Sequence, residues 1–306
     1  MENTFSMDFA GRNFTIKTNY VAAQADGSAL VSYGDTVVLV TAVSSRTARE
    51  GVDFLPLTVD YQEMTFAAGK IPGGFFKREG RPNEREILTS RIIDRAIRPL
   101  FPKGYYSETQ LVATLLSVDK ENDADVAAMI GASAALGISD IPFKGPVAGV
   151  RVGRINGQLV ANASAEQMLE SEMSLFLVGR KTVPGDAGRP YGVELVMMEG
   201  EAKEVTEDVI VEAIKFGLEA VRPMIDLQDR VRGAVGKAKR EVQEEVPDEE
   251  LIGKVRAEAL PGLREGYGMP RKLERYGKLS EVREAVIKKI GADDAVLCKK
   301  VAAIIE

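Results

Sequence analysis

The sequence contains no histidine and no tryptophan, and it has a single cysteine, Cys298, among its 306 residues. Without histidine, Ser-His-Asp and Cys-His nucleophiles, imidazole metal ligands and histidine pH switches are all excluded. One cysteine excludes a disulfide framework and a cysteine-cluster zinc site. Any chemistry must therefore rely on carboxylates, lysine and arginine, hydroxyls, backbone amides or a hard cation such as Mg²⁺.

The chain also lacks long apolar runs and an excess of positive charge. No segment approaches the roughly 18 apolar residues of a membrane span, and the N-terminus lacks a signal peptide's apolar stretch. We therefore expect a cytoplasmic protein that has no membrane partner. The net charge of −6 argues against diffuse coating of nucleic acid, so any contact with nucleic acid must be local.

Charge density divides the chain into two parts. Residues 1–233 contain 57 charged residues, about 24%, whereas 29 of the last 73 residues are charged, about 40%. The first part mixes strand and helix patterns, and the second shows only helical ones. We predict an α+β domain over 1–233 and an all-helical domain over 234–306, with the boundary near Gly233.

Periodicity and turn signals give the expected elements. Strands are predicted near 5–8, 13–18, 29–33, 36–44, 54–61, 109–118, 147–155, 158–160, 174–179 and 191–199. Helices are predicted at 83–98, at 125–136 and from Thr206 toward Pro223. Further helical segments are expected near 234–246, 248–260, 279–290 and 293–305, with a Gly- and Pro-containing loop across 261–277. Because the sequence stops within an expected helix, we interpret it as a truncated chain.

The most informative segment is a glycine-rich loop followed by the predicted helix at 83–98. Between Lys77 and Arg98 there are seven basic and four acidic residues, a local excess of +3. The loop carries Phe75 and Phe76, followed at once by Lys77 and Arg78. Adjacent aromatic rings and cations suit single-stranded RNA, because bases stack on the rings and the backbone needs positive charge. Placement of the two phenylalanines in the protein core is the alternative.

The predicted helix carries a second group of cations. At about 100° per residue, Arg91, Arg95 and Arg98 fall within an arc of roughly 60°. The other side is expected to hold the apolar residues Leu88, Ile92, Ile93, Ala96 and Ile97. Three guanidiniums in a row repel one another unless anions neutralise them. Phosphate or RNA backbone is one candidate anion, and protein carboxylates such as Glu84 and Asp94 are the other.

Residues 69–102, which include this loop and helix, resemble the signature of bacterial polynucleotide phosphorylase. The segments 24–27, 33–38 and 129–136 are also similar to that family, as is the charged helical tail. Two positions depart from the family pattern. Lys77 stands where arginine is common, which replaces a bidentate fork with a point charge. Ala96 stands where proline is common.

The resemblance implies a 3′-to-5′ exoribonuclease that degrades mRNA by phosphorolysis, releasing nucleoside diphosphates reversibly. It implies a first RNase PH-type core domain with ribosomal-protein-S5-like topology, a helical linker domain and assembly into a homotrimeric ring. Inorganic phosphate is the co-substrate, and Mg²⁺ is bound by residues outside this chain. Contact with RNA-degradation complex proteins is also implied.

The family assignment places the catalytic and metal-binding residues in a second core domain that this chain does not match. We therefore expect no catalytic residue and no metal ligand here, apart from a supporting role for Arg98, and we expect this part alone to be inactive. Phe75, Phe76, Lys77 and Arg78 are the implied RNA contacts. The alternative is a non-catalytic RNA-binding ring subunit of an exosome-like assembly. A stand-alone tRNA-trimming RNase PH enzyme is disfavoured by the helical tail.

Overall fold

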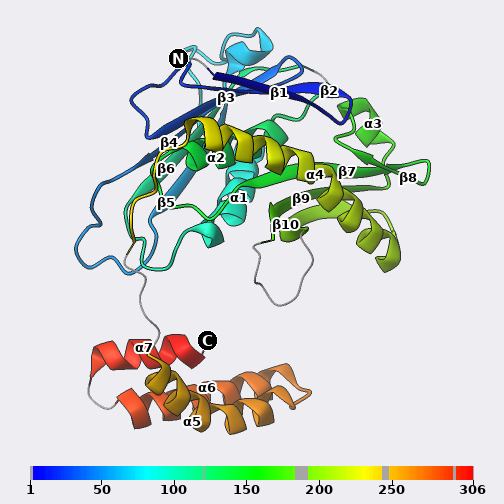
Figure 1. The fold of residues 1–306 in the computed structure, drawn as a ribbon. Coiled ribbons are helices and arrows are strands. Elements are labelled where there is room, and N and C mark those ends of the chain that lie inside the picture. Colours follow the sequence, from blue (N-terminus) through cyan, green and yellow to red (C-terminus); the bar gives the residue numbers. More distant parts are fainter. Residues whose placement is uncertain (1–2, 120, 183–191, 243–247, 292–293, 306) are drawn as a thin grey trace. The chain divides into compact units, whose positions relative to one another are not determined.

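A computed structural model of the chain describes residues 3–119, 121–182, 192–242, 248–291 and 294–305. The chain divides into two compact units between Glu244 and Glu245 (Figure 1). The division falls within 243–247, outside the described residues. The boundary predicted at Gly233 is thus placed too early, because Gly233 lies inside a helix of the first unit.

The first unit contains a six-stranded sheet with the strand order β1-β2-β3-β4-β6-β5 (Figure 1). Neighbouring strands are antiparallel, except that β5 and β6 run parallel. The strands are β1 (Asn3–Phe9), β2 (Arg12–Thr18), β3 (Gly27–Tyr33), β4 (Thr36–Ser44), β5 (Leu57–Glu63) and β6 (Thr109–Ser117). Each lies at a predicted position, with β5 beginning three residues late.

A second sheet of four antiparallel strands has the order β10-β9-β7-β8. Its elements are β7 (Val147–Ile155), β8 (Gln158–Ala161), the short helix α3 (Ala165–Leu169), β9 (Met173–Lys181) and β10 (Val193–Ala202). The hairpin predicted at Asn156-Gly157 joins β7 to β8. The strand predicted from Tyr191 begins outside the described residues.

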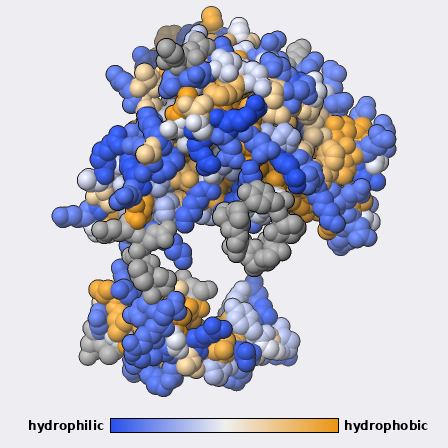
Figure 2. Space-filling model, in the orientation of Figure 1, coloured by the Kyte–Doolittle hydropathy of each residue, from blue (hydrophilic) through white to orange (hydrophobic). Residues whose placement is uncertain are grey.

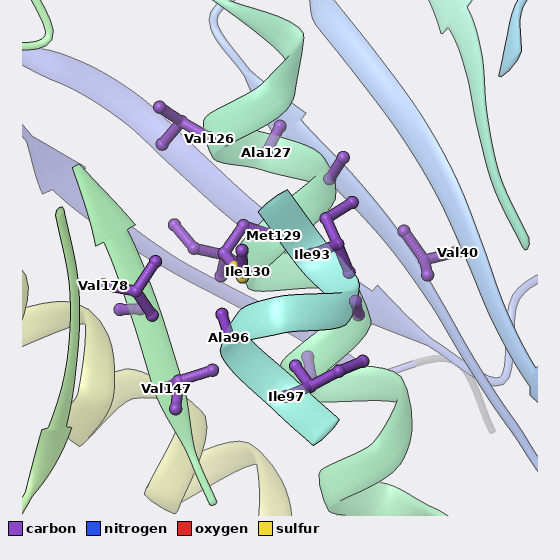
Figure 3. Close-up of a cluster of buried hydrophobic side chains, with 14 of the residues drawn as sticks. Val40, Ile93, Ala96, Ile97, Val126, Ala127, Met129, Ile130, Val147 and Val178 are labelled. Carbon is purple, nitrogen blue, oxygen red and sulfur yellow. The ribbon is translucent and has the colours of Figure 1, made fainter. Parts of the chain in front are cut away.

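Two core helices, α1 (Glu84–Ile97) and α2 (Ala124–Ile138), lie between the sheets, as Figure 3 shows. All residues of α2 except Gly137 are buried, and its small side chains permit close approach to β3 and β4. A Cβ added at Gly131 would lie 2.6 Å from Cγ2 of Val40. Ile93, Ala96 and Ile97 of α1 are fully buried in the same cluster (Figure 3).

Helix α4 (Glu207–Val235) passes through Pro223, where the sequence predicted that it would end. A proline inside a helix costs about 3 kcal/mol, because it removes a hydrogen bond and crowds the preceding turn. The helix continues because Val221, Met224 and Ile225 are buried on the second sheet. Burying each such side chain stabilises the fold by about 1.5–3 kcal/mol, which outweighs that cost.

Residues 236–242 are not helical, contrary to the prediction for 234–246. Their cations instead bind the core unit. The Nζ atom of Lys239 donates to the carbonyls of Leu136 and Ser139, both at 2.7 Å, at the end of α2. Arg240 pairs with Asp140 at 2.9 Å. A cation at a helix C-terminus is favoured by the helix dipole. Lys239 and Arg240, which were predicted to lie in a helix, therefore attach residues 236–242 to the core unit.

The second unit consists of α5 (Glu249–Tyr267), α6 (Lys272–Gly291) and α7 (Ala295–Ile305). Its buried core is formed by Leu251, Val255, Ala259, Val286 and Val301. The loop predicted across 261–277 is largely helical, because α5 continues through Pro261 and α6 begins at Lys272. The predicted fold class, an α+β core followed by a small all-α unit, is confirmed.

The surface of both units is mainly hydrophilic on the face shown in Figure 2, with separate apolar patches. Among the helices that the structure describes, none is both long and apolar enough to cross a membrane.

Candidate nucleic-acid interface

The glycine-rich loop projects two aromatic rings into solvent. The exposed fractions of Phe75 and Phe76 are 93% and 81%. Their ring centroids lie 5.4 Å apart, and the ring planes are nearly perpendicular at 85°. The backbone has positive φ on both sides of the pair, at Gly74 (74°) and Lys77 (50°), which turns the chain sharply there. Placement of these phenylalanines in the core of this chain is excluded.

The cations that follow are also exposed. Within the described residues, Lys77 and Arg78 have no hydrogen bond or ion pair to another side chain or carbonyl. The one carboxylate of the loop belongs to Glu79, and it does not pair with these cations. It accepts hydrogen bonds from the backbone N and Oγ1 of Thr65, at 2.8 and 2.6 Å. These bonds lower the pKa of Glu79, the side-chain bond most, and tie the loop to the preceding turn. The positive charge of the loop is therefore not neutralised internally.

Helix α1 starts at a well-defined cap. Asn83 Oδ1 accepts from the backbone N of Glu86 at 2.9 Å, and the Glu86 side chain accepts from the N of Asn83 at 2.6 Å. The other carboxylate oxygen of Glu86 accepts from the N of Glu63 on β5 at 2.8 Å. The helix start is thus held against the sheet, and the loop before it has a fixed end.

The apolar face of α1 agrees with the prediction at every position except Leu88. Leu88 is 44% exposed and lies beside Arg91, not opposite it. Residues three apart share one side of a helix, which accounts for this placement.

The three arginines of α1 have different environments. Arg91 is exposed and has no partner among the described residues. Arg95 forms an ion pair with Glu199 of β10. Arg98 pairs with Asp94 through Nε at 3.0 Å and Nη2 at 2.6 Å. Of the two candidate anions, protein carboxylates therefore neutralise Arg95 and Arg98, and Arg91 alone of the three has no described carboxylate partner.

Arg98 also binds the backbone that leads into β5. Its Nη1 and Nη2 atoms donate to the carbonyls of Leu55 and Leu57, both at 3.1 Å. The guanidinium thereby joins the end of α1 to the sheet. Asp94, one of the carboxylates that the sequence offered as a partner, lies one helical turn before Arg98, and this spacing favours the pair. Glu199 was missed because it lies 104 residues from Arg95 and no local pattern connects them.

A depression of about 600 Å³ lies over this face of α1. Its lining residues are Leu88, Arg91, Asp94, Arg95, Arg98, Pro99 and Glu199. Among the cations that line this depression, Arg91 is the one that pairs with no described carboxylate. An anionic group can therefore bind at its guanidinium. A second depression of about 570 Å³ lies at the loop and includes Phe75, Phe76 and Arg78.

Behind α1, a buried charge network was also missed. Arg151 of β7 binds Asp123 at 3.0 Å and also binds Asp125, while Arg85 of α1 lies 3.4 Å from Asp123. Burial raises the pKa of Asp123, and the nearby Asp125 raises it further. The network fixes the first turn of α1 against α2 and β7. No local pattern in the sequence connects these residues, because Arg85 and Arg151 are distant in sequence from Asp123.

No group of three or more acidic, histidine or cysteine side chains that could hold a metal ion occurs within the described part of the chain.

Two family models match most of the core unit. Residues 10–142 match domain 1 of the 3′ exoribonuclease family, and residues 145–220 match domain 2 of the same family. The chain belongs to the 3′ exoribonuclease family. The exposed loop and α1 both lie within the match to domain 1 of this exoribonuclease family.

The curated relatives share one name. A polyribonucleotide nucleotidyltransferase from Syntrophus aciditrophicus is 63% identical over 306 residues, which are 100% of this chain and 43% of the relative. One from Geobacillus kaustophilus is 49% identical over 294 residues, 96% of this chain and 39% of the relative. The chain thus spans about two-fifths of the length of these relatives. The predicted resemblance to the N-terminal part of bacterial polynucleotide phosphorylase is confirmed.

The fold is also similar to the crystal structure of rice (Oryza sativa) Rrp46. The TM-score is 0.56 at 18% identity, and the match covers 72% of this chain and 94% of that one. At this identity the likeness concerns the fold alone.

Proposed function

We propose that this chain is the RNA-contacting part of a 3′-to-5′ phosphorolytic exoribonuclease. The observation that carries the proposal is the exposed pair Phe75 and Phe76 next to the unneutralised Lys77 and Arg78. Burying a phenylalanine side chain stabilises a protein by about 1.5–3 kcal/mol, and the exposed Phe75 and Phe76 do not gain this free energy within the chain. A ligand that covers the two rings can gain it on binding. Unpaired nucleic-acid bases fit this role, because every base has a face that stacks on an aromatic ring.

The two rings and the two cations are arranged for a single strand. Each base that stacks on an aromatic side chain contributes about 1–3 kcal/mol to the free energy of binding, whatever the identity of the base. Lys77 and Arg78 then meet the phosphates that connect the stacked nucleotides. Bases in a duplex are already stacked and cannot present their faces, so the loop discriminates in favour of single strands.

Within α1, Arg91 is the better candidate for contact with RNA backbone or phosphate, since Arg95 and Arg98 are bound to Glu199 and Asp94. We propose that Arg98 supports the function indirectly, by fixing the position of α1. By joining α1 to the backbone at Leu55 and Leu57, it holds the helix that carries Arg91.

The reaction that the family resemblance implies needs no histidine. An oxygen of inorganic phosphate attacks the last phosphodiester phosphorus in line, the bond from that phosphorus to the 3′ oxygen of the preceding nucleotide breaks, and a nucleoside diphosphate leaves. Positioning and positive charge supply the catalysis. The family resemblance implies that the catalytic centre and the Mg²⁺ ligands lie in a second core domain, so we assign no described residue of this chain a step in the reaction. We further propose that the protein acts in mRNA degradation in the cytoplasm. In this proposal it forms a homotrimeric ring and contacts degradation-complex proteins.

Incubation of poly(A) with phosphate and Mg²⁺ tests this function. A protein of the relatives' full length that contains this chain should release ADP in a phosphate-dependent manner, and this chain alone should release none. Release of AMP without phosphate would contradict phosphorolysis. ADP release by this chain alone would contradict the location of the catalytic centre. RNA binding by the full-length protein without any product would instead support the non-catalytic ring subunit.

A further inference from the structure

The turn between α5 and α6 carries a second set of exposed aromatic and basic side chains, far in sequence from the glycine-rich loop. Tyr267, the last residue of α5, is 71% exposed, and Tyr276, in the second turn of α6, is 55% exposed. Arg271, Lys272 and Arg275 lie between them in the sequence. These five residues are called the helical tip below. Figure 1 shows the turn between α5 and α6 at the end of the helical unit opposite the C-terminal end of α6.

The helical tip is held by close helix packing. A Cβ at Gly262 of α5 would lie 2.6 Å from Cγ2 of Val282, and one at Gly266 would lie 2.9 Å from Cδ2 of Leu279 on α6. Only glycine lets the two helices approach this closely just before the turn. The exposed side chains therefore project from two closely packed helix ends.

Positive charge dominates around the helical tip. From Arg264 to Lys278 there are five basic and two acidic residues. Both acidic side chains are already paired, Glu274 with Arg271 at 3.2 Å and Glu265 with Lys278 at 2.9 Å.

The remaining cations of the helical tip gather around an aromatic ring. Lys272 Nζ and Arg275 Cζ lie 5.7 and 5.9 Å from the ring centroid of Tyr276. Both cations lie over this ring. Cations in this position supply positive charge for the phosphate of a nucleotide whose base contacts the ring.

We propose that the helical tip is a second binding site for single-stranded RNA, separate from the loop at Phe75. Bases stack on Tyr267 and Tyr276, and Lys272 and Arg275 contact the backbone. An acidic peptide would satisfy the cations but leave the tyrosine faces uncovered, so RNA is the partner that uses all the exposed groups. The site goes beyond the proposed function, because it gives the helical unit an RNA contact of its own.

The test uses this chain with Phe75→Ala and Phe76→Ala already introduced, so that binding by the loop does not mask the helical tip. Fluorescence anisotropy with a labelled oligoadenylate should show a loss of at least about thirtyfold in the remaining affinity when Tyr267→Ala and Tyr276→Ala are added. Lys272→Gln with Arg275→Gln should make the dependence of log K on log salt shallower by about 0.7 for each cation that contacts a phosphate. Leu273→Ala is the matched control, because Leu273 is 85% exposed beside the helical tip and is not aromatic.

Unchanged affinity in the tyrosine variant would overturn the proposal, and so would an equal loss in the Leu273→Ala control. Displacement of the oligoadenylate by polyglutamate as readily as by poly(A) would also overturn it and would indicate an acidic protein partner. Circular dichroism should show that all variants retain their helices. Phe75 and Phe76 are replaced in every arm, so a negative result here does not bear on the function proposed for the loop.

Discussion

At the scale of single residues, Arg91 and Arg98 show how one residue type on one helix takes two roles. Arg91 faces solvent without a described partner, whereas Arg98 gives its guanidinium to Asp94 and to the carbonyls of Leu55 and Leu57. The first is available to an anionic ligand, and the second stabilises the position of α1.

Arg98→Lys should therefore destabilise the core unit. A lysine ammonium cannot reproduce the planar fork that reaches Asp94 and two carbonyls together. Losing these charge-assisted bonds is expected to lower the free energy of unfolding by about 1–3 kcal/mol, measured by urea denaturation.

The matched control for Arg98→Lys is Arg91→Lys, which keeps the charge on the same helix and removes no described bond. It should leave the urea midpoint unchanged. Equal stability of both variants would contradict the positioning role of Arg98.

Sequence alone predicted the exposed pair Phe75 and Phe76, because glycines precede the pair and cations follow it. It did not predict the partner of Arg95. Glu199 belongs to the other sheet, and only the packing of α1 against β10 brings the two side chains together. Charge pairs within one helical turn can be read from spacing, whereas pairs across the fold depend on topology.

At the scale of elements, the strands were predicted well and the helix ends less well. Alternating burial and short turns define β1 to β4 locally, so they lie where the pattern placed them. Pro223 and Pro261 were read as helix ends, but both helices continue through them. Propensity is a local quantity, and burial of an apolar helix face against the rest of the fold outweighed it in both cases.

The anchoring of residues 236–242 depends on Asp140, which follows α2. Hydrogen bonding from Arg240, followed by that from Arg46, lowers the pKa of Asp140 from its ordinary 3.8 to about 2. A lowered carboxyl pKa means that the stabilisation is complete above the unfolded value and is lost as the pH falls through the folded value. This anchor should therefore weaken between about pH 4 and pH 2.

Asp140→Asn should lower the free energy of unfolding by about 1–2 kcal/mol at neutral pH and have little effect near pH 2. Denaturation at both pH values measures this difference. Asp35→Asn, at an exposed turn, is the control and should behave like the unaltered chain at both. If Asp140→Asn lowered the free energy of unfolding equally at both pH values, the claim that the ionised Asp140 carboxylate anchors this segment would be wrong.

At the scale of the whole molecule, an acidic chain with a net charge of −6 carries two local regions of basic and aromatic side chains. One is the loop at Phe75 in the core unit, and the other is the helical tip. The family match extends over the core unit, and the relatives are more than twice the length of this chain. The proposed RNA contacts can therefore be tested in this chain, apart from the chemistry proposed for the remainder.

The most direct measurement is the affinity of this chain for a short single-stranded oligoadenylate, with and without Phe75→Ala and Phe76→Ala. Loss of two stacking faces should weaken binding by about thirtyfold or more. Phe54→Ala is the control, because Phe54 is a 62% exposed phenylalanine outside the loop, and its removal should leave the affinity unchanged. Equal affinities for the loop variant, the control and the unaltered chain would contradict the assignment of the loop as the RNA contact.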